Sequence, residues 1–526
     1  MSPLKPTPMS SAESAPARAR LPRQIPFIIG NEGCERFSFY GMRNILTPFL
    51  VTSLLMYLPE SERPGAAKDV FHTFVIGVYF FPLLGGWLAD RFLGKYRTVL
   101  WLSLVYCVGH LCLALFEHSV AGFYTGLALI AFGAGGIKPC VAAFVGDQFD
   151  ESNRKLAKVV FDAFYWIINV GSFLASLLMP FFLRNYGAAV AFGLPGALMF
   201  VATVVFWMGR RHYVMVPPSR NDPHSFARVV RTALTAKREG QPRPGLAVAV
   251  VATCLAVAML ALAPSLGIVA TLCIALVLLI GGGALGTRMQ LERARGAHPD
   301  DAIDGVAAVL RVLVVFALVT PFWSLFDQKA STWVLQANAM SVPDWLHPAQ
   351  MQALNPLLVL LLIPFNNLVL YPLLRRRGIE PTALRRMTAG IFLAAIAWVI
   401  VGAMQLALDG GDPISIAWQI LPYVFLTMGE VLVSATGLEF AYSQAPPAMK
   451  GTLMSFWTLS VTVGNLWVLL ANAGVRNEGV LAAIAGTGLG TTAFQMFFFA
   501  AFAAVAGLAF GLYARRYREV DYYRSA

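Results

Sequence analysis

Long apolar segments recur along almost the whole chain, and they constrain its fold more than any other feature. A helix needs about 20 consecutive, mainly apolar residues to cross a bilayer. The chain is 57% hydrophobic and only 13% charged, whereas soluble domains carry about 25% charged residues. We therefore expect an all-α integral membrane protein with fourteen transmembrane helices. The predicted spans are 27–55, 69–90, 98–116, 120–145, 159–183, 190–209, 246–263, 266–286, 306–337, 351–374, 384–407, 415–440, 451–472 and 488–514.

The spacing of these spans is uneven and follows a pattern of six, two and six. Two halves of six spans are typical of transporters whose binding site lies between the halves. The two middle spans contain almost no polar residues, which predicts a lipid-facing hairpin. The predicted parts are a disordered cytoplasmic tail (1–26), a six-helix bundle (27–211), a cytoplasmic linker (212–245), a two-helix insert (246–286), a second cytoplasmic linker (287–303), a second six-helix bundle (304–514) and a cytoplasmic tail (515–526).

The net charge of +12 is distributed unevenly between the two sides of the predicted bundle. Most of the 40 Lys and Arg residues fall in loops and tails on the side that carries both termini. By the positive-inside rule, this side is cytoplasmic. The concentration of Lys and Arg on the cytoplasmic side therefore explains the positive net charge, and we expect no nucleic-acid partner. The six cysteines lie within or beside spans without zinc-type spacing, and we expect no metal site.

The first span carries a stripe of ionisable groups on one helical face. Glu32, Glu35 and Arg36 are spaced i, i+3 and i+4, and Tyr40 and Arg43 continue the same face. Each buried Arg or Asp in a span costs about 2.5–3.5 kcal/mol even on mild scales. The face must therefore point into a bundle or a water-filled cavity. A structural salt bridge between helices is one interpretation, and a polar path through the membrane is the one that we favour.

Three further spans contain charged residues with candidate roles. Lys138 follows a glycine-rich stretch, whose glycines allow close helix packing, and it needs an anionic partner such as Glu32, Glu35 or Asp327. Asp327 shares a helical face with Trp323, and a buried carboxylate that pairs and unpairs with a cation suits a proton carrier.

Glu430 shares a face with Ser434 and has no cation near it in the sequence. A carboxylate without a protein partner suits a cationic ligand group, or it is protonated. Asn169, in the fifth span, can donate and accept hydrogen bonds, which equally fits contacts between helices.

Two sets of motifs resemble known families. The loop after the second span, G-G-W-L-A-D-R-F-L-G-K, resembles the signature loop of the major facilitator superfamily, which gates the cytoplasmic side. Five further strings resemble the proton-dependent oligopeptide transporter family, and the match extends over nearly the whole chain. They are E-x-x-E-R-F, G-G-I-K-P, F-Y-x-x-I-N-x-G-S, F-W-x-L-F-D-Q and G-E-V-L-x-S-x-T-G-L-E-F. The insert resembles the extra hairpin of many bacterial members.

The resemblance implies a major facilitator fold and inward, proton-coupled symport of di- and tripeptides by alternating access. It implies a multi-pass protein of the inner (plasma) membrane that acts as a monomer, uses the proton gradient and needs no cofactor. The residues implied in proton coupling are Glu32, Glu35, Arg36, Lys138, Asp327 and His72. Those implied in peptide binding are Arg36, Tyr40, Arg43, Tyr79, Lys138, Asn169, Trp323, Asn355, Glu430, Ser434 and Trp457. Those implied in gating are Asp90, Arg91, Arg43 and Asp327, and the last two match a pair that forms a salt bridge in the family.

The resemblance also assigns the two ends of the peptide. Glu430 matches the acid that receives the amino terminus, with Asn169 and Asn355 beside it. Three cations (Arg36, Arg43 and Lys138) meet the carboxylate. His72 matches a histidine of animal relatives, and a satisfied histidine at a helix end is the alternative.

Two positions depart from the pattern of the family. Phe39 stands where many relatives have Tyr. Asn367 stands where animal relatives have an Asp that pairs with the position of Arg311.

Other functions remain open. A carrier of another small solute, such as nitrate, a drug or a peptide-like metabolite, fits the same fold. A peptide sensor and an efflux antiporter are weaker alternatives. We do not expect an enzyme, because the sequence contains no H-E-x-x-H motif, no Cys or His metal cluster and no glycine-rich phosphate loop.

Overall fold

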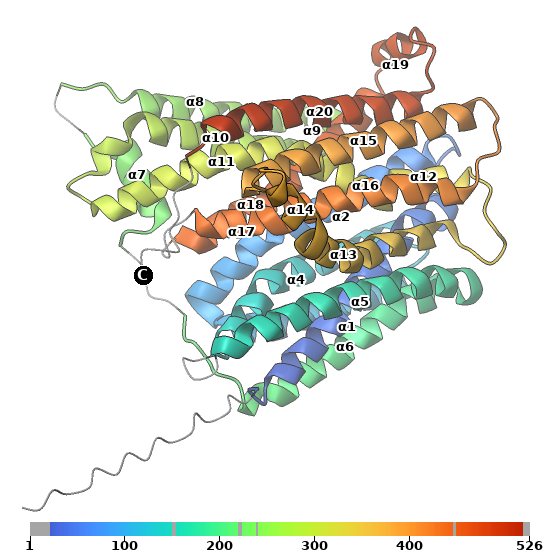
Figure 1. Cartoon of the computed structure of the whole chain (residues 1–526), viewed down its shortest axis with the longest axis horizontal. Helices are drawn as coiled ribbons and strands as arrows, with labels where there is room; N and C mark the ends of the chain where they lie inside the picture. Colours follow the sequence, from blue (N-terminus) through green and yellow to red (C-terminus); the bar gives the residue numbers. More distant parts are fainter. Residues whose placement is uncertain (1–20, 150–153, 219–222, 238–239, 445–448, 519–526) are drawn as a thin grey trace, which may run out of the picture.

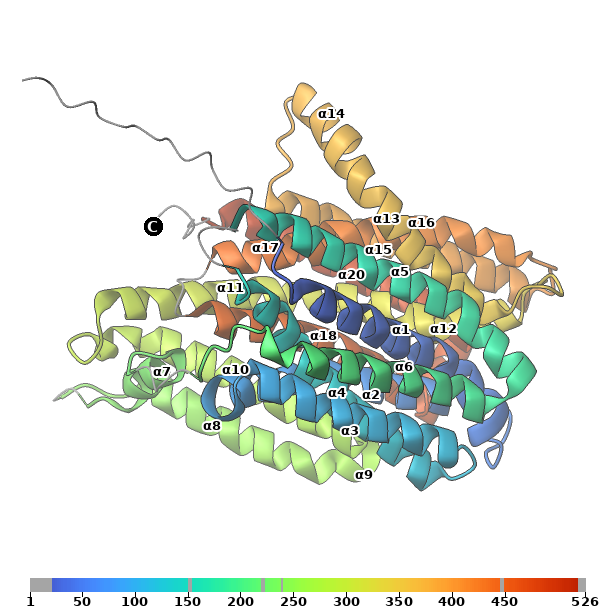
Figure 2. The same ribbon diagram turned by 90° about the horizontal axis from the view of Figure 1, so that it is seen from below.

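The computed structural model describes residues 21–149, 154–218, 223–237, 240–444 and 449–518. Helices make up the regular structure of this part, apart from two isolated β-bridges. The predicted cytoplasmic tails lie largely outside it, since residues 1–20 and 519–526 are not among the described residues. The long helices run side by side through one elongated body, as Figures 1 and 2 show.

The first six long helices form the N-terminal bundle. α1 lies against α5 and α6, and α4 lies against α2 and α3. The glycine-rich stretch of α4 packs closely, because a Cβ atom on Gly85 of α2 would come within 2.4 Å of the Gly136 backbone. The helices are α1 (Ile25–Phe49), α2 (Arg63–Leu88), α3 (Lys95–Leu115), α4 (Val120–Gly146), α5 (Arg154–Tyr186) and α6 (Ala188–Met208).

The middle of the chain holds more helical structure than the sequence indicated. The first predicted linker contains an amphipathic helix, α7 (Phe226–Thr235), with Val229 and Ala233 buried. The insert forms α8 (Pro244–Met259), the short α9 (Ala263–Leu266) and α10 (Ile268–Gln290). Pro264 and Ser265, which connect the two predicted spans of the insert, are therefore helical, and the chain reverses at Gly267, whose φ is +83°. The hairpin lies along one edge of the molecule (Figure 2).

The C-terminal bundle contains several interrupted helices. The span that begins with α11 breaks at a 3-10 turn, Gln328–Ala330, directly after Asp327. The span that begins with α16 passes through a π-turn, Val431–Ala435, directly after Glu430. Such irregular turns are frequent at functional sites. The helices are α11 (Asp300–Asp327), α12 (Thr332–Asn338), α13 (Leu354–Phe365), α14 (Tyr371–Arg376), α15 (Ala383–Asp409), α16 (Ile420–Glu430), α17 (Thr436–Ser443), α18 (Lys450–Gly474) and α20 (Thr491–Arg516).

Thirteen helical segments of the described chain are long and apolar enough to cross a membrane. α1 is not among them, because its charged stripe makes it too polar by composition, yet it is buried inside the N-terminal bundle. The thirteen segments and α1 together account for the fourteen predicted spans. A short helix, α19 (Glu478–Ala485), stands apart at one end between α18 and α20 (Figure 1). The two bundles meet along α2 with α18 and along α5 with α13.

Candidate functional site

The charged stripe of α1 is a compact ion-pair cluster within a single helix. Arg36 Nε lies 3.0 Å from a carboxylate oxygen of Glu32, and its Nη2 pairs with Glu35. The side chains of all three residues are at most 6% exposed. Since two carboxylates face one guanidinium, the cluster carries a net negative charge when all three groups are ionised. It can therefore hold a proton in addition to its own ion pairs.

Arg43 lies two turns further along α1 and pairs with the other bundle. Its Nη2 donates to Asp327 Oδ1 of α11 at 2.6 Å, and both side chains are almost fully buried. The guanidinium also lies over the Phe71 ring at 5.4 Å. A charge-assisted bond in such a dry environment is strong, and the loss of one partner would leave an uncompensated buried charge. The predicted Arg43–Asp327 pair is therefore present and joins the two halves.

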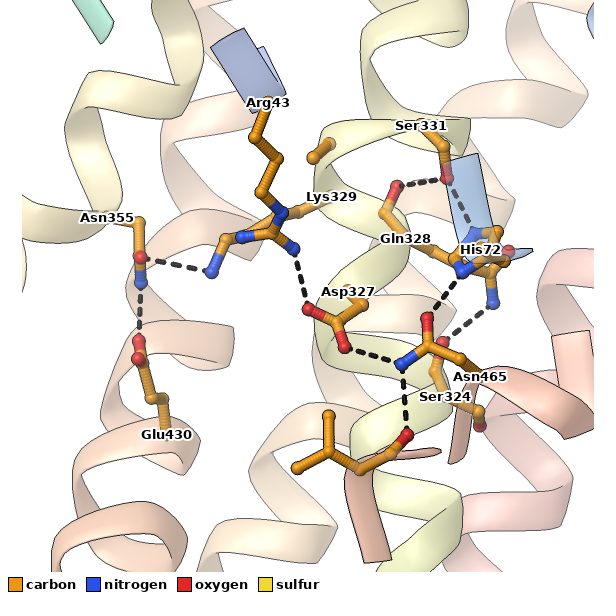
Figure 3. A network of polar contacts seen from close by, with 12 residues as sticks. Arg43, His72, Ser324, Asp327, Gln328, Lys329, Ser331, Asn355, Glu430 and Asn465 are labelled. Carbon is orange, nitrogen blue, oxygen red and sulfur yellow. Dashed lines mark hydrogen bonds and ion pairs between the residues drawn. The ribbon is translucent and has the colours of Figure 1, made fainter. Parts of the chain in front are cut away.

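His72 belongs to the same network. Its Nδ1 lies 2.6 Å from Asn465 Oδ1, and its Nε2 lies 2.9 Å from the Ser331 hydroxyl. Asn465 Nδ2 in turn donates to the second oxygen of Asp327 at 2.8 Å. Figure 3 shows this chain of contacts from α2 through α18 to α11. Both ring nitrogens have partners, but the histidine lies in the third turn of α2 and not at a helix end, and its partners belong to the other bundle.

Glu430 is tied to a cation that lies far from it in the sequence. Lys329 Nζ donates to Asn355 Oδ1 at 3.0 Å, and Asn355 Nδ2 donates to Glu430 Oε2 at 2.5 Å (Figure 3). Asn355 also donates to the Thr427 hydroxyl at 3.1 Å. The prediction that Glu430 lacks a protein partner is therefore wrong. The break in the span after Asp327 brings Lys329 to this position.

Lys138 faces aromatic rings. Its Nζ lies 4.2 Å from the centre of the Tyr79 ring and 5.1 Å from that of Phe39. Among the described residues it forms no ion pair within 4.0 Å, contrary to the predicted contact with Glu32, Glu35 or Asp327. The ring that replaces the expected tyrosine thus contributes to a cation–π contact, which is worth about 2 kcal/mol when desolvated.

The remaining predicted peptide-binding residues lie on several helices. Trp323 Nε1 donates to the Ser460 hydroxyl at 3.1 Å, and its ring packs edge-to-face on Trp457 at 5.8 Å. The Tyr40 ring packs edge-to-face on Phe39. Asn169 Nδ2 donates within α5, to the Tyr165 carbonyl oxygen at 3.0 Å. Ser434 is half-buried in the π-turn after Glu430.

The predicted gating loop forms a π-turn, Ala89–Leu93, that contains Asp90 and Arg91. The chain leaves this turn at Gly94 with a φ of +75°, which favours glycine. The next residue, Lys95, pairs with Asp147, directly after α4, at 2.6 Å. This ion pair fastens the end of the loop to the N-terminal bundle.

Several contacts between the bundles lie at the end opposite the termini. Thr47 donates to the Ala330 carbonyl oxygen at 2.8 Å, and Gln352 donates to the Asn44 carbonyl oxygen at 3.1 Å. Arg476, just after α18, pairs with Asp69 near the start of α2. With Arg43 and His72, these contacts join the bundles on this face of the protein.

The site also contains residues to which the sequence assigned no role: Lys329, Ser331 and Asn465. Asn465 connects His72 with Asp327, Ser331 contacts His72, and Lys329 donates to Asn355. Their polar character within spans was the available signal. Their partners are up to 393 positions away in the sequence, so the contacts could not be derived from spacing.

Two six-helix bundles that share a buried polar network at their interface define a carrier of the major facilitator class. The profile of the POT family (PTR2) matches residues 96–474. One solved structure, described as an auto-inhibited POT family peptide transporter, is 68% identical with a TM-score of 0.94, and the match covers 96% of this chain and 99% of that one. A second, the POT family transporter PepTSo, is 66% identical with a TM-score of 0.93 and coverages of 94% and 98%.

The protein therefore belongs to the POT family. Solute carrier family 15 member 2 of Rattus norvegicus is 35% identical over 426 residues, which is 77% of this chain and 52% of the relative. The chain thus spans about half the length of the curated relatives that it matches.

Proposed function

We propose that the protein is a proton-coupled symporter that imports di- and tripeptides by alternating access. Membership of the POT family supports this proposal, as do relatives and solved structures described as peptide transporters. The observation that carries it is the division of buried charge at the interface between the bundles. With all groups ionised, the N-terminal bundle has a net charge of +1 here, since three cations (Arg36, Arg43 and Lys138) face Glu32 and Glu35. The C-terminal bundle has a net charge of −1, since Asp327 and Glu430 face Lys329.

This division suits a zwitterion. The peptide carboxylate is drawn to the cations of the N-terminal bundle, and its ammonium group is drawn to Glu430. The aromatic side chains nearby, including Trp323 and Trp457, provide surfaces that tolerate different peptide side chains. Binding between the bundles couples to their relative motion.

The Arg43–Asp327 pair is the proposed gate. A proton on the Asp327 carboxylate removes its negative charge, so the ion pair breaks and Arg43 becomes available to the peptide carboxylate. His72 and Asn465 hold the other side of that carboxylate and adjust to its protonation. Loss of these bonds releases the bundles on the face opposite the termini.

The proposed proton carriers also include the cluster of Glu32, Glu35 and Arg36. This cluster lies within the N-terminal bundle and does not depend on the gap between the bundles. Lys138 lies nearby over Phe39, and a peptide carboxylate would give it the anion that it lacks. Asp90 and Arg91 are proposed to act in the gate at the basic end.

The proposed amine site consists of Glu430 with Asn355 and Lys329. An arriving ammonium group replaces Asn355 as the donor to Glu430, and Lys329 remains bound to the Asn355 oxygen. Ser434, one turn beyond Glu430, and Asn169 of α5 offer further polar groups to the peptide backbone.

The proposed topology follows the charge pattern. The basic side, with both termini, faces the cytoplasm, and the protein lies in the inner (plasma) membrane. The contacts of Arg43, His72 and Thr47 then close the extracellular side. The proposed domain boundaries remain those of two bundles joined by cytoplasmic linkers around the insert. A monomer suffices, because the site lies within one chain.

Uptake into proteoliposomes tests the function. With an inward acid gradient, we expect a dipeptide such as dialanine to accumulate, and a protonophore to abolish this accumulation. The same vesicles are tested with nitrate and with an N-acetylated, C-amidated dipeptide as controls. No accumulation of any of several dipeptides, or gradient-driven uptake of nitrate alone, would contradict the proposal.

A further inference from the structure

We propose that the hairpin insert binds an anionic phospholipid. In this proposal, one acyl chain lies in an apolar groove between α8 and α10, and the phosphate lies near Arg288, Arg311 and Tyr513. The inference does not depend on the transported substrate, and it assigns a ligand to the part of the chain that the transport site does not use.

The groove is apolar and open to the membrane. Its volume is about 500 Å³, and residues of both helices line it. Val251 and Val277 are 58% and 39% exposed, as expected on a lipid-facing surface. Its lining includes Val248, Val251 and Leu255 of α8 and Val277, Leu278 and Gly281 of α10.

Small residues set the shape of the groove. A Cβ atom on Gly245 would lie 2.1 Å from the Gly286 carbonyl oxygen, and one on Gly282 would lie 2.1 Å from the Ala252 Cβ. The two helices are therefore in close contact along this line. Gly281 is beside this contact, and a Cβ there would meet nothing within 4 Å. The missing side chain leaves the space that an acyl chain can fill.

Two arginines lie on the adjacent helices α10 and α11, toward the basic end of both spans. Arg288 of α10 and Arg311 of α11 both act electrostatically on the Tyr513 hydroxyl of α20. This hydroxyl donates to the Arg311 carbonyl oxygen at 3.2 Å. In the part of the chain that the structure describes, neither guanidinium is paired with a carboxylate within 4.0 Å. Two like charges without an acid between them suit an anion.

Helix geometry connects the two parts of the site. Gly281 and Arg288 are seven residues apart, which is about two turns or about 10 Å along the same face of α10. Arg288 lies near the end of α10, on the basic side, and Gly281 lies deeper in the span. A ligand that spans both must have an anionic head at the membrane surface and an apolar tail beside it.

These requirements identify a phospholipid and not a free anion. Arg binds phosphate well because its planar group presents several donors. Basic residues near a membrane surface each add about 1 kcal/mol to the binding of anionic lipid, or about fivefold in affinity. The apolar groove adds a term that inorganic phosphate cannot use.

Native mass spectrometry of the detergent-purified full chain tests the proposal. The protein is supplied with phosphatidylglycerol or phosphatidylcholine of identical acyl chains. We expect at least about fivefold more retained phosphatidylglycerol. The double variant Arg288→Gln/Arg311→Gln should lose this preference, whereas the matched variant Arg376→Gln/Arg377→Gln, at the exposed end of α14, should keep it.

A second matched pair of variants tests the groove. Gly281→Leu fills the groove, and Gly283→Leu places the same side chain at another open position of the same helix. We expect only Gly281→Leu to reduce the bound lipid. Equal retention of the two lipids, or unchanged retention in the arginine double variant, would overturn the proposal. The proposal would also be overturned if inorganic phosphate bound wild type and Gly281→Leu equally and displaced no lipid. The site would then hold a free anion.

Discussion

Two arginines of α1, seven residues apart, are both buried against carboxylates, but the carboxylates come from different places. Arg36 pairs with Glu32 and Glu35 of its own helix, whereas Arg43 pairs with Asp327 of the other bundle. A local cluster survives any relative motion of the bundles, because its members move together. A pair that crosses the interface must break when the bundles separate. One helix therefore combines a stationary charge cluster with a movable one.

This difference suggests a division of labour. In the proposed mechanism, the stationary cluster changes its protonation in every state of the transporter. The movable pair acts as the proposed gate, because it forms only when the bundles meet. The His72–Asn465 link strengthens the second role, since it approaches the same carboxylate from α2 and α18.

The largest effect is expected for Asp327→Asn. Removal of one partner of a buried ion pair costs about 3–5 kcal/mol, so Arg43 should destabilise the closed interface and driven dipeptide uptake should fall about 100-fold. Proteoliposome uptake under an acid gradient measures this change. Asp409→Asn, at an exposed helix end, is the control and should retain uptake. Normal uptake by Asp327→Asn would remove the pair from the gate.

Glu35→Gln should impair gradient-driven uptake of dipeptide but not the exchange of labelled for unlabelled dipeptide. The neutral side chain leaves Arg36 paired with Glu32 only, and we expect gradient-driven uptake to fall about 30-fold, by about 2 kcal/mol for a charged hydrogen bond. Counterflow of labelled against unlabelled dipeptide should stay near wild type, because the bundle interface is intact. Glu32→Gln should behave alike. If both variants accumulate peptide normally, the stationary cluster plays no part in coupling.

Glu430→Gln should weaken the binding of peptides that have a free amino group. Loss of a charged partner for the ammonium group is worth about 1.5 kcal/mol or more, which predicts about tenfold weaker competition for uptake. N-acetylated dipeptides provide the control, since they have no ammonium group to lose. An equal effect on both classes would show that Glu430 acts on the fold of the π-turn and not on the amine.

Asn465→Ala should have a smaller effect. It removes one neutral bridge between His72 and Asp327 but leaves the Arg43 pair in place, so we expect about a fivefold decrease in driven uptake. Uptake as low as that of Asp327→Asn would instead place the histidine bridge, and not the arginine, at the centre of the gate.

Phe39→Tyr should have the smallest effect, about twofold on the relative affinity for different dipeptides. Both rings can hold Lys138 by a cation–π contact, and only the added hydroxyl is new. A competition panel of dipeptides against one labelled dipeptide measures it. A large loss for all peptides would mean that the pocket has no room for the hydroxyl.

Much of the fold could be predicted from the sequence, because apolar length alone defines a span. The charged stripe of α1 and the Arg43–Asp327 pair were also predictable, the first from helical spacing and the second from resemblance. The resemblance also placed Asn355 beside Glu430, where the structure has it. The link from Glu430 to Lys329 and the surroundings of Lys138 could not be predicted. Lys329 reaches Asn355 only because the span breaks after Asp327, and the sequence of this region does not reveal that break. Lys138 contacts aromatic rings and not carboxylates, and this contact depends on packing across several helices.

The distance between the bundles tests the central claim most directly. Spin labels replace Tyr57 and Trp345, two exposed residues on the face opposite the termini, in a cysteine-free background. Pulsed electron–electron double resonance measures the distance between the two labels. Asp327→Asn should shift the distribution to longer distances, and Glu35→Gln should leave it unchanged. An unchanged distribution in Asp327→Asn, or the same shift in Glu35→Gln, would contradict the distinction between a movable pair and a stationary cluster.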